Sequence, residues 1–220
     1  PRGKAESYAK EFGRLGIPID AARGGFYDTT EVSDFLSLLQ ILDNPLQDIP
    51  LLAVLRSPLV GMSLNELAAL RLTQRKGPLW TALRGFDRES ANATSLSVDD
   101  IQSTASESAR PKVARFLESH AHWRKLARQG SLSQCLETAI DEGRYEDWLL
   151  TRQRGVQRRA NLQRFLAQAR QFDQFQRQGL FRFLKHIEAQ RENELEPEPA
   201  GAESANAVRL ISVHRSKGLE

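Results

Sequence analysis

The sequence has little of what defines secreted, membrane or disulfide-rich proteins. A single cysteine, Cys135, excludes an internal disulfide and is typical of a reducing compartment. No apolar run approaches the roughly 20 residues that a membrane helix needs. The N-terminal residues Pro1 to Lys4 are not followed by the apolar segment of a signal peptide. We therefore expect a cytoplasmic chain without a membrane partner.

Signatures of a self-contained enzyme are also missing from the sequence. No GxxxxGK[ST] phosphate loop, HExxH zinc motif, CxxC pair or nucleophile elbow occurs. His120 and His122 are two residues apart, which places them on different faces of a helix and makes a shared metal ion improbable. We therefore expect no catalysis by this chain alone, no metal site and no cofactor bound to it.

The charges that are present permit binding to nucleic acid without requiring it. Thirty-one Lys and Arg residues nearly balance 28 Asp and Glu residues, which leaves a net charge of +3. Residues 152–170 carry only basic charges, whereas residues 188–203 are rich in glutamate. The basic stretch fits either a phosphate-binding face or an ordinary solvated helix face, and the acidic stretch fits a linker.

Apolar residues at helical spacing predict a mainly α-helical body. Ser63, with Glu66 three residues later, predicts a capping box at the start of a helix with core positions Leu64, Leu67, Leu70 and Leu72. Residues 87–110 are polar and serine-rich, and they predict a loop with a short helix near 98–107. Further helices are predicted over 5–15, 29–42, 48–56, 112–129, 131–140, 145–150, 157–177 and 180–191.

Short strands are predicted on either side of this helical body. Ile17-Pro18-Ile19 reads as a strand near the start, and residues 208–213 alternate with β-branched side chains near the end. Residues 194–206 are rich in Pro, Glu and Ala and predict a flexible linker.

Three blocks of sequence resemble the UvrD/RecB-like superfamily 1 DNA helicases. Residues 208–220, VRLISVHRSKGLE, resemble motif V of these enzymes, and Gly24-Gly25-Phe26-Tyr27 resembles the segment that follows motif IV. Residues 47–58 and 157–162 resemble the AddA-type helicase–nuclease subunit more than UvrD itself. Together these blocks cover most of the chain except residues 85–110.

The resemblance implies a domain order. Residues 1–47 correspond to part of the RecA-like 2A domain, residues 48–205 to a helical 2B-type insertion, and residues 206–220 to the return strand of 2A with motif V. The expected fold is mainly α, with a small α/β remnant of 2A formed by both chain ends. The chain is then expected to be a segment of a longer ATP-dependent DNA helicase or helicase–nuclease of double-strand-break repair, with the ATPase motifs outside it.

The resemblance also implies which residues meet nucleotide and DNA. In motif V, Glu220 meets the nucleotide ribose, with Lys217 and Gly218 beside it, and His214 faces single-stranded DNA. ATP and Mg belong to the intact parent, and its DNA is both single-stranded and duplex. The other expected DNA contacts are Ser212, Arg215 and Ser216 in motif V, the helix–turn–helix residues Arg56, Ser57, Gly61 and Ser63, and Arg158 and Arg159 on the basic helix.

Alternatives remain at several of these positions. Ser63 also fits a plain helix cap, since relatives carry two glycines in a turn that here has only one. Arg158 and Arg159 also fit contacts to a second helicase–nuclease subunit, in which case the domain is an interaction scaffold without direct DNA binding. Trp80, Trp123 and Trp148 can stack on bases, but their apolar neighbours predict core positions.

Overall fold

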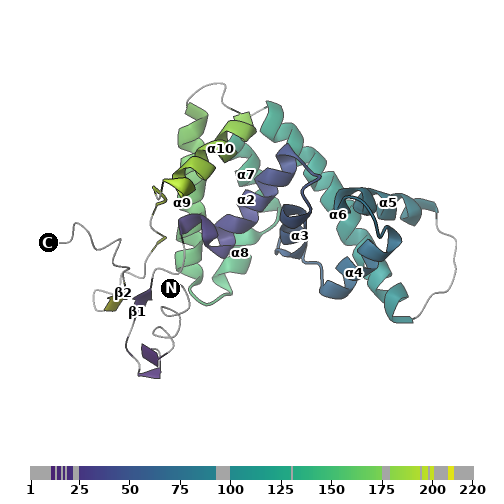
Figure 1. Ribbon diagram of the computed structural model, residues 1–220, viewed down its shortest axis with the longest axis horizontal. Helices are drawn as coiled ribbons and strands as arrows, with labels where there is room; N and C mark the ends of the chain where they lie inside the picture. The colour runs from purple at the N-terminus through teal and green to yellow at the C-terminus, as the bar shows by residue number, and fades with distance from the viewer. Residues whose placement is uncertain are drawn as a thin grey trace.

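The computed structural model of the protein is mainly helical (Figure 1). It describes residues 11–12, 14–15, 17, 19–21, 25–92, 100–129, 131–174, 179–193, 195–197, 199–200 and 208–210. Its elements are β1 (Ile19–Ala21), the 3-10 helix η1 (Phe26–Asp28), α2 (Thr30–Asp43), α3 (Asp48–Arg56), α4 (Leu64–Thr73), α5 (Leu79–Asn92), α6 (Asp100–Gln129), α7 (Leu132–Glu142), α8 (Tyr145–Leu150), α9 (Gly155–Gln174), α10 (Gly179–Glu192) and β2 (Val208–Leu210).

Helix α2 lies at the centre of the core. Its sequence is apolar around most of its circumference, as expected of a helix that is covered on several sides. It packs against α3, α6, α9, α10 and η1. Phe35, Leu38, Leu39 and Ile41 are fully buried. In Figure 1, α2 lies among α7 to α10, while α4, α5 and the first half of α6 project to one side.

Helix α6 corrects the prediction of a loop over residues 87–110. Helix α5 continues to Asn92, and α6 begins at Asp100 and runs through Pro111 to Gln129. Its buried stripe is Ala109, Val113, Phe116, His120 and Trp123, at alternating spacings of four and three residues. The loop prediction failed because Ala109, the first buried position, is too small to stand out among serines.

Two predicted core positions of α4 are also wrong. Leu67 and Leu70 are buried, but Leu64 is 67% exposed and Leu72 is 43% exposed. Helix α4 packs on α6 and α5 through one narrow face, and Leu64 and Leu72 fall outside it. Of the three tryptophans, Trp123 is buried, whereas Trp80 and Trp148 are only partly buried against the core.

The short strands near the two ends of the chain pair with each other. Strand β1 runs parallel to β2, with Ile19 opposite Val208 and Ala21 opposite Leu210. The first strand starts two residues later than predicted, because Ile17 lies before it. The second strand is confirmed over residues 208–210, and residues 211–213 lie outside the described part. The helical body is therefore inserted between two strands of one parallel pair.

The return segment contacts this helical body, although the sequence predicted a flexible linker. The Tyr27 backbone N–H donates to Glu196 at 3.3 Å, and the Ala200 N–H donates to the Asn161 side chain at 2.6 Å. Arg191, at the end of α10, donates to the Tyr27 carbonyl at 2.9 Å and pairs with Asp28 at 3.3 Å. These contacts join the return segment and α10 to η1, inside the block that resembles the sequence after motif IV.

Candidate nucleic-acid interface

The turn between α3 and α4 carries the predicted helix–turn–helix residues. Gly61 has φ +70°, the left-handed conformation that suits glycine, and a Cβ there would meet nothing within 4 Å. The Met62 N–H donates to the Leu55 carbonyl at 2.9 Å and closes the turn. Ser57 is buried, and its hydroxyl donates to the Val54 carbonyl at 2.8 Å. The Ser57 hydroxyl therefore shapes the turn rather than facing solvent, whereas Arg56 is exposed.

The predicted capping box at Ser63 is confirmed. The Ser63 N–H donates to the Glu66 carboxylate at 2.6 Å, and the Glu66 N–H donates to the Ser63 hydroxyl at 3.3 Å. Lys112 and Ser108, both from α6, reach the same carboxylate at 2.8 Å. Burial alone disfavours the Glu66 carboxylate, but these hydrogen bonds outweigh it and lower its pKa to about 2.

This cap changes what the helix start can hold. A free helix N-terminus favours an anion through its N–H groups and its dipole. Here a buried carboxylate occupies the first turn, and it uses the Ser63 N–H. Lys112 offsets that charge and also donates to the Gly61 carbonyl at 2.9 Å. A DNA phosphate at this turn therefore depends on the exposed Arg56 and Ser63 side chains more than on the helix dipole.

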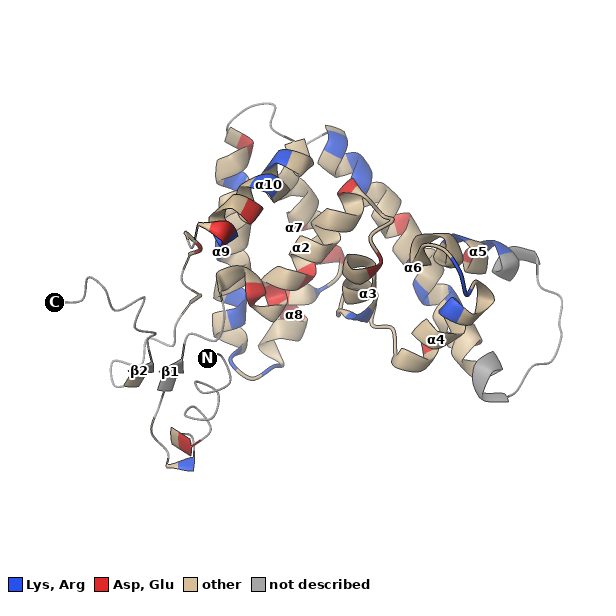
Figure 2. Cartoon of the chain, in the orientation of Figure 1, with Lys and Arg blue, Asp and Glu red and all other residues tan. Residues whose placement is uncertain are grey.

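The basic stretch of residues 152–170 is partly neutralised by acids from other helices. Arg159 pairs with Glu146 of α8 at 2.9 Å, and Arg170 pairs with Glu137 of α7 at 2.7 Å. Figure 2 shows acidic and basic segments side by side where α8 meets the start of α9. Arg158 is half-buried, while Arg159 keeps an exposed side chain. The net positive surface on α9 is therefore weaker than its sequence suggests.

The two blocks of resemblance in α2 and α9 meet through buried polar groups. Asn161 is buried, and its amide donates to the buried Glu31 carboxylate at 2.7 Å. The Asn161 carbonyl accepts the Ala200 N–H, so one side chain connects α2, α9 and the return segment. Nearby, the Tyr145 hydroxyl donates to Asp34 at 2.6 Å. Burial raises the pKa of Asp34 to about 6, partly opposed by this hydrogen bond.

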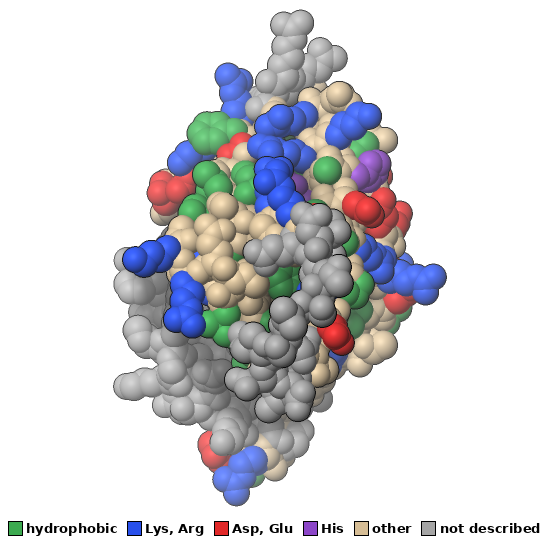
Figure 3. Space-filling view, turned by 90° about the vertical axis from the view of Figure 1, so that its right-hand side faces the viewer, with side chains coloured by type: hydrophobic (Ala, Val, Ile, Leu, Met, Phe, Trp, Pro, Cys, Tyr) green, Lys and Arg blue, Asp and Glu red, His purple; other side chains and the backbone are tan. Residues whose placement is uncertain are grey.

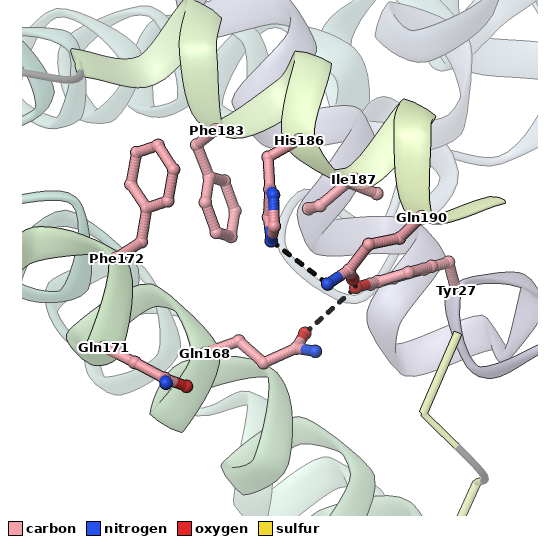
Figure 4. Close-up of a pocket in the computed structure, with 8 residues that line it drawn as sticks. All are labelled: Tyr27, Gln168, Gln171, Phe172, Phe183, His186, Ile187 and Gln190. Carbon is pink, nitrogen blue, oxygen red and sulfur yellow. Dashed lines mark hydrogen bonds between the residues drawn. The ribbon is translucent and has the colours of Figure 1, made fainter. Parts of the chain in front are cut away.

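A cavity of about 450 Å³ lies between η1, α9 and α10 (Figure 4). Its lining combines the rings of Phe172 and Phe183 with three glutamine amides. The Tyr27 hydroxyl lies within hydrogen-bonding distance of the Gln168 and Gln190 side chains. Its polar groups therefore bond mainly to one another, as expected of an internal contact between helices.

Most of the predicted motif V residues lie outside the described part of the chain. These are Ser212, His214, Arg215, Ser216, Lys217, Gly218 and Glu220. The described residues Val208–Leu210 form β2 beside β1. The arrangement places the start of motif V next to the segment that leads into η1 and α2.

The sequence analysis missed a different basic surface. Arg84 and Arg88 lie one turn apart on α5, and Arg124 and Arg128 lie one turn apart on α6. The spacing of four within each pair was a readable signal, because such residues share a helix face. That the two pairs line one hollow follows only from the packing of α5 against α6.

Searches of the described residues for two other kinds of site were negative. Within these residues, no three His, Cys, Asp or Glu side chains come together as a metal site would require. None of the described helices is long and apolar enough to cross a membrane.

Comparison with known proteins agrees with the fold and the motifs. A model of the UvrD-like helicase C-terminal domain family matches residues 2–220. The chain belongs to this family, as its resemblance to UvrD-like helicases predicted.

Similar proteins within the family bear names that make each of them one subunit of an ATP-dependent helicase/nuclease. The relative of this name from Desulforudis audaxviator is 40% identical over 221 residues, covering 99% of this chain and 17% of its own length. Those from Acetivibrio thermocellus and Lysinibacillus sphaericus are each 38% identical, over 222 and 214 residues, covering 100% and 96% of this chain and 16% of their own lengths. The chain thus spans about a sixth of these relatives.

Proposed function

We propose that the chain is the 2B-type helical insertion of an ATP-dependent DNA helicase–nuclease subunit, with the flanking pieces of its 2A domain. In this proposal residues 1–47 and 206–220 belong to 2A, and residues 48–205 form the insertion. The observation that carries it is the parallel pairing of β1 with β2, which brings the two 2A pieces together across the whole helical body. The full-length relatives' names, which combine a helicase and a nuclease, supply the proposed activity of the parent.

The role proposed for this chain is to contact DNA beside the motor. Arg56, Gly61 and Ser63 form an exposed turn for a duplex backbone, with Ser57 setting its shape, and Arg158 and Arg159 extend the basic surface on α9. In motif V, His214, Ser212, Arg215 and Ser216 are assigned to DNA, and Lys217, Gly218 and Glu220 to ATP. ATP and Mg act in the intact cytoplasmic parent, and this chain alone is not expected to hydrolyse ATP.

DNA-binding measurements test this role directly. Fluorescence anisotropy of the 220-residue chain with a labelled duplex should show weak binding that declines steeply with salt, because phosphate contacts release counterions. Arg56→Gln combined with Arg159→Gln should weaken duplex binding about fivefold, in line with the loss of two phosphate contacts. Neutralisation is preferred to charge reversal, because a glutamate at 159 would face Glu146.

The matched control combines Arg75→Gln with Arg182→Gln, since both arginines are exposed and the net charge changes equally. Equal losses in the two double variants would mean that only net charge matters and would count against the assigned surface. ATP turnover by the purified chain would contradict its assignment as an accessory piece.

A second function, docking of a partner subunit, is favoured by an apolar surface on α3. Ile49 is 83% exposed and Leu52, one turn later, is 39% exposed; Leu46, just before the helix, is 54% exposed. Apolar side chains gathered at one place on a surface are typical of protein contacts. The alternative proposal is therefore that this face of α3 contacts a second helicase–nuclease subunit.

Co-purification with that second subunit tests the alternative. Ile49→Asp should abolish the complex, whereas Val156→Asp, at a residue that is 78% exposed on α9, should leave it intact. Retained complex formation in Ile49→Asp would exclude this face as the contact.

A further inference from the structure

A continuous groove runs between α5 and α6. Its two hollows, of about 620 and 640 Å³, share the lining residues Trp80, Arg84 and Arg124. Each is as large as the pockets that hold small ligands. We call this feature the α5–α6 groove; Arg88 lines the first hollow, and Lys125 and Arg128 line the second.

The α5–α6 groove is strongly positive. Five Lys and Arg residues line it against two acids, Asp43 and Asp87. Within the described residues, none of the five cations lies within ion-pair distance of a carboxylate, in contrast to Arg159 and Arg170 on α9. Figure 3 shows Lys and Arg side chains gathered in the upper part of this face. A groove with unpaired cations attracts a polyanion.

Arg124 gives a more local indication. Its Nε is buried and has no hydrogen-bond partner in the described structure. A buried donor without an acceptor is costly, so native proteins rarely retain one without a reason. An anion in the groove would offer this guanidinium the acceptor that the protein does not supply.

Trp80 adds an aromatic surface to the groove. It lines both hollows and is only partly buried, although the sequence predicted a core position. The His120 ring supports it from behind at a centroid distance of 4.6 Å, and Phe116 lies at 6.5 Å. His120 is itself fixed by the Ile41 carbonyl at 3.2 Å. Trp80 is therefore a rigid platform between two groups of cations.

We propose that the α5–α6 groove binds single-stranded nucleic acid. Arg84, Arg124 and Arg128 contact successive phosphates, and an unpaired base stacks on Trp80. Cations that follow a backbone and an aromatic ring that takes a base are the combination by which proteins hold single strands without sequence preference. An acidic protein segment would use the same cations but would have no need for the Trp80 platform.

This site goes beyond the proposed function, because it uses none of the residues assigned to duplex DNA. It also places single-strand binding on the helical insertion itself, away from motif V. Either assignment can therefore fail without the other.

The charge contribution is tested with a labelled oligothymidylate of about 12 nucleotides, within the usual site size of single-strand-binding folds. Arg84→Glu with Arg128→Glu should weaken binding by the 220-residue chain at least tenfold. The slope of log K against log salt should fall by about 1.4, at roughly 0.7 for each lost phosphate contact. Both arginines are exposed, so thermal unfolding should be unchanged.

The control combines Arg144→Glu with Arg182→Glu, which are exposed and do not line the groove. Similar losses in both double variants would overturn the proposal. A loss of duplex binding in Arg56→Gln with Arg159→Gln, together with single-strand binding that the groove variants do not change, would sustain the proposed function and overturn this one.

The platform is tested by tryptophan fluorescence. Single-stranded DNA should quench the protein's emission, and this quenching should disappear in Trp80→Phe but persist in Trp148→Phe, at another partly buried tryptophan. Affinity should also fall several-fold in Trp80→Phe, because a smaller ring stacks less well. Quenching that persists in Trp80→Phe would overturn the stacking contact. Competition by polyglutamate as effective as that by the oligonucleotide would overturn nucleic acid as the ligand.

Discussion

Glu66 should stabilise the junction of α4 and α6 through its negative charge. Its carboxylate is buried, caps α4 and is held by Lys112 and Ser108 of α6. The pKa falls from a usual 4.5 to about 2, a difference of roughly 2.5 units that corresponds to about 3 kcal/mol. Glu66→Gln keeps a side chain that completes a capping box but removes the charge. We expect it to lower the free energy of unfolding at pH 7 by about 2–3 kcal/mol.

The dependence on pH identifies the cause. Because the pKa of Glu66 is lower in the folded state, its contribution is fully present above pH 4.5 and is lost as the pH falls towards 2. Urea unfolding at several pH values should therefore show the difference between wild type and Glu66→Gln shrinking over that range. Glu118→Gln, the same change at an exposed position of α6, should cost less than about 0.5 kcal/mol.

Two results would refute this reasoning. One is a cost for Glu66→Gln no larger than that for Glu118→Gln at pH 7. The other is a cost that does not change between pH 5 and pH 2, which would point to packing of the side chain rather than to its charge.

Three further predictions concern other local features. Because burial raises the pKa of Asp34 to about 6, its ionisation opposes folding, and stability should fall as the pH rises from about 4 to 6; Asp34→Asn should flatten that fall in urea unfolding. Asn161→Ala removes the partner of a buried carboxylate and should cost about 2–3 kcal/mol, whereas Asn65→Ala, at an exposed position, should cost less than about 0.5 kcal/mol. Gly61→Ala should cost about 1–2 kcal/mol, because φ is +70° there although space is open. Gly85→Ala, inside α5 and also in open space, should instead stabilise by about 0.5–1 kcal/mol; calorimetry that gives both changes the same sign would contradict the conformational argument.

The candidate site was only partly predictable from the sequence. The turn at Gly61 and the cap at Ser63 depend on residues a few positions apart, and both were recognised. The DNA-binding role given to Arg159 remains a proposal, and the structure pairs this residue with Glu146. The α5–α6 groove was missed because its cations come from two helices whose approach no local pattern records.

The sequence by itself determined the helical class, most helix boundaries and the family, because these depend on periodicity, caps and contiguous motifs. Tertiary structure alone decided that Ala109 extends the buried stripe of α6 and that Asn161 meets Glu31 across 130 residues. It also decided which arginines are neutralised on α9 and which remain unpaired beside Trp80. The physical reason is that charge pairing and burial depend on distance in space, and packing brings together side chains that are far apart in the chain.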